Sequence, residues 1–127
     1  MNLVDSSGWL EYFGGEVNAK LFAPAIENNS ELIVSTINLY EVYKKISTLK
    51  NENSAKEAIA TMMQAKVVEV SSSIALSAAK LSFELKMPMA DSLIYITAQF
   101  NNAIIWTQDY DFKDLDGVKL IKKINKN

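Results

Sequence analysis

Acidic residues recur in this chain where short apolar segments end. Asp5 directly follows Leu3 and Val4, and Asp109 comes two residues after an apolar run that stops at Thr107. Carboxylates grouped around one cleft repel each other, and their pKa values rise unless a cation is bound. Mg²⁺ and Mn²⁺ prefer carboxylate and water oxygens, and their usual substrates carry phosphate. The pattern therefore favours metal-dependent chemistry at a phosphoryl group.

The residues that are absent narrow the chemistry further. The 127 residues include no histidine, cysteine or arginine. This excludes Ser-His-Asp and Cys-His nucleophile systems, zinc sites built from His or Cys, and general acid–base catalysis by histidine. The four glycines form neither a GxGxxG nor a GxxxxGK[ST] loop, so dinucleotide and P-loop sites lack their motif. Hydrolysis of a phosphodiester by metal-activated water needs none of these groups.

Most of these acids also have a structural interpretation. Asp5 suits the N-cap of a helix, and Asp91, in Met-Ala-Asp-Ser-Leu, suits a first helical turn, where it favours the dipole. Asp109 and Asp111 are typical of turns. Taken singly, each acid leaves the structural and the functional interpretations open.

Glu41 has a different alternative role. It points away from the apolar stripe of its predicted helix, and Lys45 follows four residues later. Glu and Lys in this order stabilise an exposed helical surface. A glutamate in an active site must also avoid the core stripe, so the position is compatible with both roles.

The elements that position these acids alternate between strand and helix. We predict strands at residues 2–5, 32–35, 66–70, 103–107 and 118–121, and helices at 6–13, 18–28, 37–49, 54–65, 73–85 and 90–101. Thr36 and Ser54 are the expected N-caps of the third and fourth helices, the latter with Glu57 in a capping box. This alternation predicts an α/β fold with a parallel sheet of about five strands covered on both faces. In such sheets ligands bind beyond the carboxyl ends of the strands, where Asp5 and Asp109 lie.

Composition and length set the broad class. The chain is 49% hydrophobic and 22% charged, with a net charge of −2, which is ordinary for a globular protein and gives no global attraction to nucleic acid. We expect one domain over residues 1–127. We find no membrane-spanning run and no cleavable leader, and we expect a cytoplasmic protein.

Four segments resemble the acidic motifs of PIN-domain ribonucleases, in the family's order. They are VDSSGWL (residues 4–10), STINLYEV (35–42), ADSLIYITA (90–98) and TQDYDF (107–112). The chain's size is most similar to that of VapC-type toxins from toxin–antitoxin pairs. The resemblance implies a three-layer α/β/α sandwich and a metal-dependent endoribonuclease.

The resemblance also implies roles for particular residues and partners. Mg²⁺ or Mn²⁺ would be held by Asp5, Glu41, Asp91 and Asp109. Supporting roles would fall to Thr107, Asp111 and Ser6. The implied partners are an RNA substrate, a cognate antitoxin whose C-terminal segment covers the site, and a second copy of the chain in a homodimer. Because arginine is absent, Lys44, Lys45 or Lys113 could take its place at RNA or an antitoxin carboxylate, as weaker geometric matches.

Two other functions are compatible with parts of the pattern. The first is a non-catalytic PIN-like module that binds RNA or protein, although such a module has no need of so many repelling carboxylates. The second is a phosphoacceptor receiver or phosphatase-like domain that uses Asp5. Two features of this chain argue against the second function. The third predicted strand does not end in an aspartate, and Asp5-Ser6-Ser7 lacks the DxD spacing of the phosphatase type.

Overall fold

The computed structural model describes residues 1–124 and contains a five-stranded parallel sheet. The strand order is β3-β2-β1-β4-β5, and each neighbouring pair is parallel. All five predicted strands are confirmed, each shorter than or equal to its predicted range: β1 (Asn2–Val4), β2 (Leu32–Ser35), β3 (Lys66–Val68), β4 (Ile104–Thr107) and β5 (Val118–Leu120).

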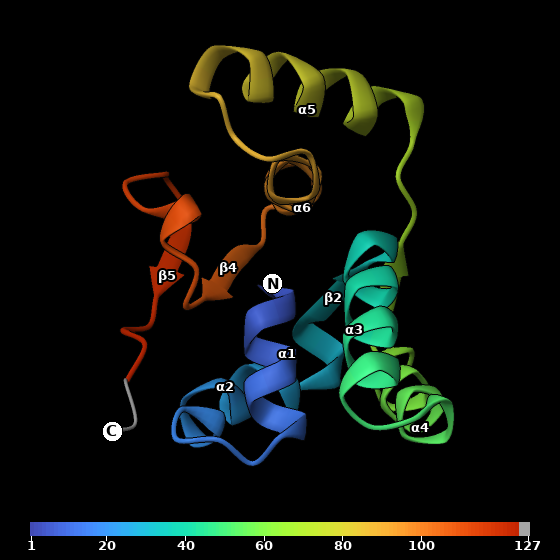
Figure 1. Cartoon of the computed structure of the whole chain (residues 1–127). Helices are drawn as coiled ribbons and strands as arrows, with labels where there is room; N and C mark the ends of the chain where they lie inside the picture. Colours follow the sequence, from blue (N-terminus) through green and yellow to red (C-terminus); the bar gives the residue numbers. More distant parts are fainter. Residues whose placement is uncertain (125–127) are drawn as a thin grey trace.

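Helices cover both faces of the sheet, as the sequence predicted. In Figure 1, α1 and α2 lie on one side of the sheet and α6 on the other, with α5 outside α6. The α-helices are α1 (Ser6–Phe13), α2 (Ala19–Ile26), α3 (Thr36–Leu49), α4 (Glu52–Met62), α5 (Ser72–Leu85) and α6 (Met89–Phe100). Two 3₁₀ helices that the sequence did not predict are η1 (Asn29–Glu31) and η2 (Tyr110–Phe112).

Strand side chains divide between two cores because successive residues of a strand face opposite sides of the sheet. Leu3 belongs to the core under α6, whereas Val4 belongs to the core under α1, α2 and α4. Ile105 and Trp106 of β4 divide in the same way. Burial on both faces explains why these strands have nearly continuous apolar sequences.

Two helices begin differently from prediction. Ser35, not Thr36, caps α3: its side chain accepts a hydrogen bond from the Ile37 backbone N–H, and Asn38 completes a capping box. Asn51, not Ser54, caps α4, and its Oδ1 accepts from the Ser54 backbone N–H at 2.8 Å. The helix that Ser54 was expected to start therefore begins two residues earlier, at Glu52.

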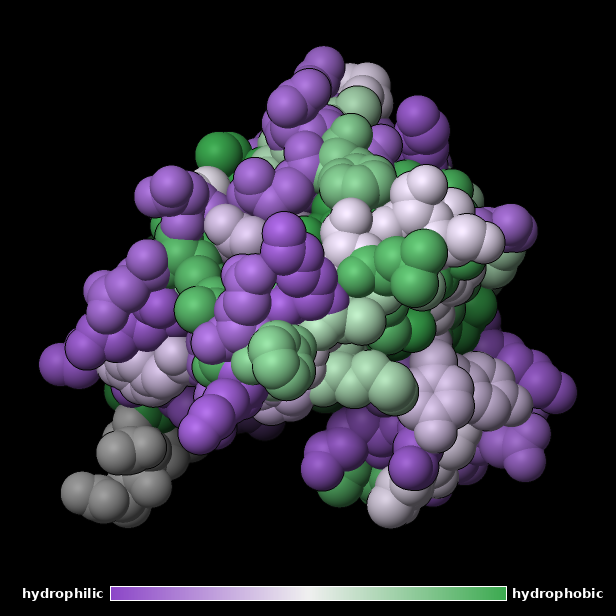
Figure 2. Space-filling model, turned by 90° about the horizontal axis from the view of Figure 1, so that it is seen from above, coloured by the Kyte–Doolittle hydropathy of each residue, from purple (hydrophilic) through white to green (hydrophobic). Residues whose placement is uncertain are grey.

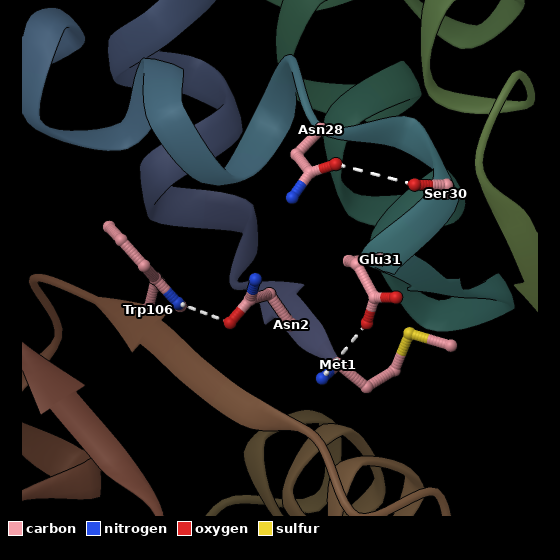
Figure 3. Close-up of polar contacts among 6 residues, drawn as sticks. All are labelled: Met1, Asn2, Asn28, Ser30, Glu31 and Trp106. Carbon is pink, nitrogen blue, oxygen red and sulfur yellow. Dashed lines mark hydrogen bonds and ion pairs between the residues drawn. The ribbon is translucent and has the colours of Figure 1, made fainter.

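Polar contacts join the central strands on the side away from the acidic residues. Figure 3 shows the Trp106 indole N–H donating to Asn2 Oδ1, at 3.0 Å, and the Met1 ammonium 3.5 Å from a Glu31 carboxylate oxygen. The Lys119 ammonium lies 3.9 Å from the centre of the Trp106 ring. These contacts link β1, β4 and β5. Within residues 1–124, no helix combines the length and apolar character needed to cross a membrane.

Candidate metal centre

The predicted acids gather at the carboxyl edge of the central strands. β1 lies between β2 and β4: the chain runs from β1 outward through β2 to β3 and then crosses back to β4 on the other side of β1. Such a switch point opens a crevice beyond the strand ends. Asp5 follows β1, Thr107 ends β4, and Asp91 lies in the first turn of α6.

Asp5 is buried at this edge of the sheet, with 3% of its surface exposed. It occupies the N-cap position of α1 but makes no capping hydrogen bond with its side chain. Its Oδ2 instead accepts hydrogen bonds from the hydroxyls of Ser7 and Thr107, both at 3.0 Å. Burial raises the pKa of Asp5 to about 6, although these two hydrogen bonds partly offset the increase.

Thr107 connects Asp5 to the acidic loop that follows β4. Its side chain is fully buried, and its hydroxyl oxygen accepts a hydrogen bond from the Asp109 backbone N–H at 2.9 Å. Asp109 in turn accepts from the Asp111 backbone N–H through Oδ1, also at 2.9 Å. Asp109 therefore has the turn-forming contact that its sequence suggested, while its carboxylate lies beside other acids.

Three carboxylates lie close enough together to share one cation. Asp91, Asp109 and Asp111 each offer an oxygen, and these atoms lie within 4.8 Å of one another. Partial burial, a hydrogen bond with Asp111 and the charges of Asp109 and Asp5 raise the pKa of Asp91 to about 8. The fold thus places mutually repelling acids where a positive charge would relieve the repulsion.

Glu41 lies near Asp5 and does not form the surface pair with Lys45 that was the alternative to a role in the site. Its Oε1 accepts a hydrogen bond from the Ser6 hydroxyl at 2.7 Å. Among the described residues, Glu41 and Lys45 form no salt bridge. The Ser6 hydroxyl also accepts from the Asn38 amide at 3.0 Å, so contacts between α1 and α3 hold this side of the site.

Sequence reasoning missed two of the residues that shape the site. Asn38 both caps α3 and orients the Ser6 hydroxyl, and Ser7 donates to Asp5. Both lie inside the quoted motifs. The role of Asn38 depends on a contact with a residue distant in sequence, and that of Ser7 depends on the direction of its side chain. The three-acid group also includes Asp111, which was predicted as a supporting residue, and within the described chain it does not include Asp5 or Glu41.

The donor set fits a hard divalent cation such as Mg²⁺ or Mn²⁺. All candidate ligands are carboxylate oxygens, and Asp5 and Asp91 both have pKa values raised by burial and neighbouring charge. Mg²⁺ usually binds one or two carboxylates and keeps several water molecules, which suits a partly exposed group of acids. The sequence offers neither thiolate nor imidazole, which Zn²⁺ sites generally use.

The fold and the acidic edge define an α/β protein with a candidate cation site at its topological switch point. A family model described as PIN domain matches residues 3–118, which is most of the chain. The chain therefore belongs to the PIN domain family. No curated protein sequence matches it.

Solved structures confirm the PIN-like fold over almost the whole chain. A toxin–antitoxin complex from Klebsiella pneumoniae has a TM-score of 0.79 at 23% identity, covering 98% of this chain and 100% of that one. Mycobacterium tuberculosis VapC20, described as a toxin that cleaves the sarcin–ricin loop, has a TM-score of 0.77 at 16% identity, covering 93% and 97%. VapBC2 from Rickettsia felis, bound to a promoter DNA fragment, has a TM-score of 0.73 at 17% identity, covering 94% and 96%.

Proposed function

We propose that this chain is a metal-dependent endoribonuclease and the toxin of a toxin–antitoxin pair. The observation that carries the proposal is the group of carboxylates at the sheet's carboxyl edge, with Asp91, Asp109 and Asp111 within 4.8 Å of one another. The family membership supports a nuclease, and the neighbours described as a sarcin–ricin loop cleaving toxin and as toxin–antitoxin complexes support RNA and an antitoxin as partners. We also propose the cytoplasm as its location and a homodimer as its assembly.

In this proposal Asp5, Glu41, Asp91 and Asp109 hold Mg²⁺ or Mn²⁺, together with Asp111. A bound divalent cation would activate water for attack on the phosphodiester and neutralise the charge that develops on the phosphate. Thr107 orients Asp5 and the Asp109 backbone, and Ser6 orients Glu41. Burial of Asp5 and Thr107 fixes this geometry before substrate arrives.

The antitoxin would cover the site from a neighbouring groove. A groove of about 700 Å³ lies between α1, α3 and α4 and reaches the site at Ser7 and Gln108. Apolar side chains such as Leu10 and Ile46 line it together with charges of both signs. Such a mixed surface suits an amphipathic protein segment.

RNA cleavage by purified, antitoxin-free protein tests the function directly. We expect internal cleavage of RNA with Mg²⁺ or Mn²⁺ and none in EDTA. The control for an occupied site is thermal unfolding, since a cation that binds only the folded state should raise Tm with concentration. A folded protein that cuts no RNA with either metal would contradict the proposal, and an unchanged Tm would favour a non-catalytic module.

A further inference from the structure

A second cavity adjoins the acidic group on the side away from Ser7 and the antitoxin groove. It measures about 400 Å³ and lies between the α5–α6 connection and the segment after η2. Asp111 lines it and also belongs to the three-acid group, so the cavity opens directly beside the candidate cation site. Its lining residues are Leu85, Lys86, Met87, Pro88, Asp111, Lys113, Asp114 and Leu115.

Two lysines in this cavity are available to an anion. Lys86 and Lys113 are both exposed, and neither forms a salt bridge within the part of the chain that the structure describes. Asp111 and Asp114 supply negative charge to the same lining. A cation bound beside Asp111 would neutralise part of that charge and leave the lysines to set the local potential.

The turn that carries Lys86 has a defined backbone. Lys86 is the C-cap of α5 and has the left-handed conformation (φ 55°) that commonly ends a helix. Asp114, on the opposite segment of the cavity lining, also has a positive φ of 66°. The Ser82 hydroxyl holds the connection through a 2.6 Å hydrogen bond to the Met87 carbonyl. This hydrogen bond therefore fixes the turn that contains Lys86.

We propose that this cavity binds a nucleotide of the RNA substrate next to the cleaved bond, with Lys86 and Lys113 contacting its phosphate. The inference rests on the proposed ribonuclease function. The volume suits one nucleotide, and Leu85 and the half-buried Leu115 offer apolar surface to a base or ribose. Because the chain has no arginine, phosphate contacts near the site depend largely on lysine.

The other lysine-lined surface near the site suits RNA less well. The groove beside Ser7 contains three lysines and three glutamates: Lys45, Lys50, Lys123, Glu11, Glu16 and Glu57. Their charges cancel, and none of the glutamates belongs to the candidate cation site. The cavity beside Asp111 differs because one of its acids would be neutralised by the cation. Phosphate contact is therefore assigned to Lys86 and Lys113.

RNA binding by the double variant Lys86→Gln plus Lys113→Gln tests the assignment. The probe is a fluorescein-labelled single-stranded RNA of about 12 nucleotides, a length that single-strand sites commonly accommodate. Anisotropy is measured with Mg²⁺ in an Asp5→Asn background, which removes a proposed catalytic carboxylate but leaves the three-acid group intact, across roughly 50 to 200 mM KCl. Lys80→Gln, an exposed lysine on α5 outside the cavity, is the matched control.

We expect the double variant to bind about tenfold more weakly at the lower salt, with the slope of log Kd against log salt reduced by roughly 0.7 for each lysine. In the protein with Asp5 unchanged, the same pair of substitutions should raise KM and leave kcat close to its original value. The subsite would be overturned if the double variant binds RNA as tightly as its parent or if the Lys80→Gln control loses as much affinity. It would also be overturned if the parent does not bind RNA. If the unmodified protein cuts no RNA, the proposed function itself fails, whatever the lysine variants bind.

Discussion

At the scale of single residues, Asp91 combines the features expected of a cation ligand with those of an ordinary helix residue. It lies in the first turn of α6, where a negative charge favours the helix dipole. Burial and three neighbouring acids nevertheless raise its pKa to about 8, so repulsion and desolvation outweigh the dipole. A purely structural aspartate would be expected to have a lowered pKa.

The raised pKa of Asp91 predicts how stability changes with pH. The folded state holds the Asp91 proton more tightly than the unfolded state, so metal-free protein should lose stability as pH rises from about 4 to 8. Asp5 acts in the same direction, but only up to about pH 6. Since the chain has no histidine, the fall in stability between pH 6 and 8 should come chiefly from Asp91.

Asp91→Asn should therefore flatten the dependence of Tm on pH between 6 and 8 in EDTA, abolish RNA cleavage, and leave metal-free stability at pH 8 equal or higher. Differential scanning fluorimetry of both proteins with and without Mn²⁺ measures this. The increase in Tm that Mn²⁺ gives the unmodified protein should grow from pH 6 to 8, because deprotonated carboxylates bind the ion. A variant that retains activity but is markedly less stable would identify Asp91 as a structural residue instead.

At the scale of elements, the end of β4 holds the site together through one hydroxyl. Thr107 joins the carboxylate of Asp5 to the backbone of Asp109, and both contacts are lost in Thr107→Val. We expect this variant to lose about 1–3 kcal/mol of stability because a buried amide and a buried carboxylate lose a partner. Cleavage should fall roughly 10- to 100-fold, since small misplacements of catalytic groups have large effects on rate.

Thr107→Ser is the matched control for the hydroxyl. It removes a buried methyl group and should cost about 1 kcal/mol, but it keeps both hydrogen bonds. Chemical denaturation and initial cleavage rates, measured together, separate packing from positioning. Activity that is kept in Thr107→Val but lost in Thr107→Ser would show that Thr107 acts through packing alone.

The elements were largely predictable from sequence because local rules determine them. β2 is an apolar run buried on both faces, β4 is an apolar run buried at Ile105 and Thr107, and the predicted bounds of both were correct within one residue. The caps of α3 and α4 were less predictable because Ser35 and Thr36, or Asn51 and Ser54, are chemically similar candidates at neighbouring positions. The backbone conformation at each position determines which candidate becomes the N-cap.

From the sequence, the acids could be predicted only to lie at the same carboxyl edge of the sheet. Parallel strands bring their carboxyl ends together, so Asp5 and Asp109 were expected to be neighbours. The membership of Asp111 in the tight group depends on η2, a single 3₁₀ turn that no sequence pattern indicated. The Ser6–Glu41 contact likewise joins residues 35 positions apart, and helical periodicity alone suggested the Lys45 pair.

At the scale of the whole molecule, α5 is the helix that the fold uses least for its own core. Only Ile74 and Ala78 of this helix are buried, whereas Leu76 and Phe83 are 73% and 87% exposed. Figure 2 views the molecule from the side of α5 and shows apolar surface among polar residues on that face. Exposed apolar patches of this kind commonly mark protein interfaces. The proposed homodimer would bury this surface.

Phe83→Glu should therefore weaken the dimer without weakening the protomer. Burial of a phenylalanine contributes about 1.5–3 kcal/mol, so the dimer Kd should rise roughly 10- to 100-fold. Light scattering over a dilution series measures the shift, with Met63→Glu, an exposed methionine at the end of α4, as the control that should remain dimeric. If Phe83→Glu remains dimeric, or if the unmodified chain is monomeric at every concentration, α5 is not a dimer interface. Because Lys86 ends α5, RNA binding by the monomeric Phe83→Glu variant would show whether the proposed subsite works without the dimer.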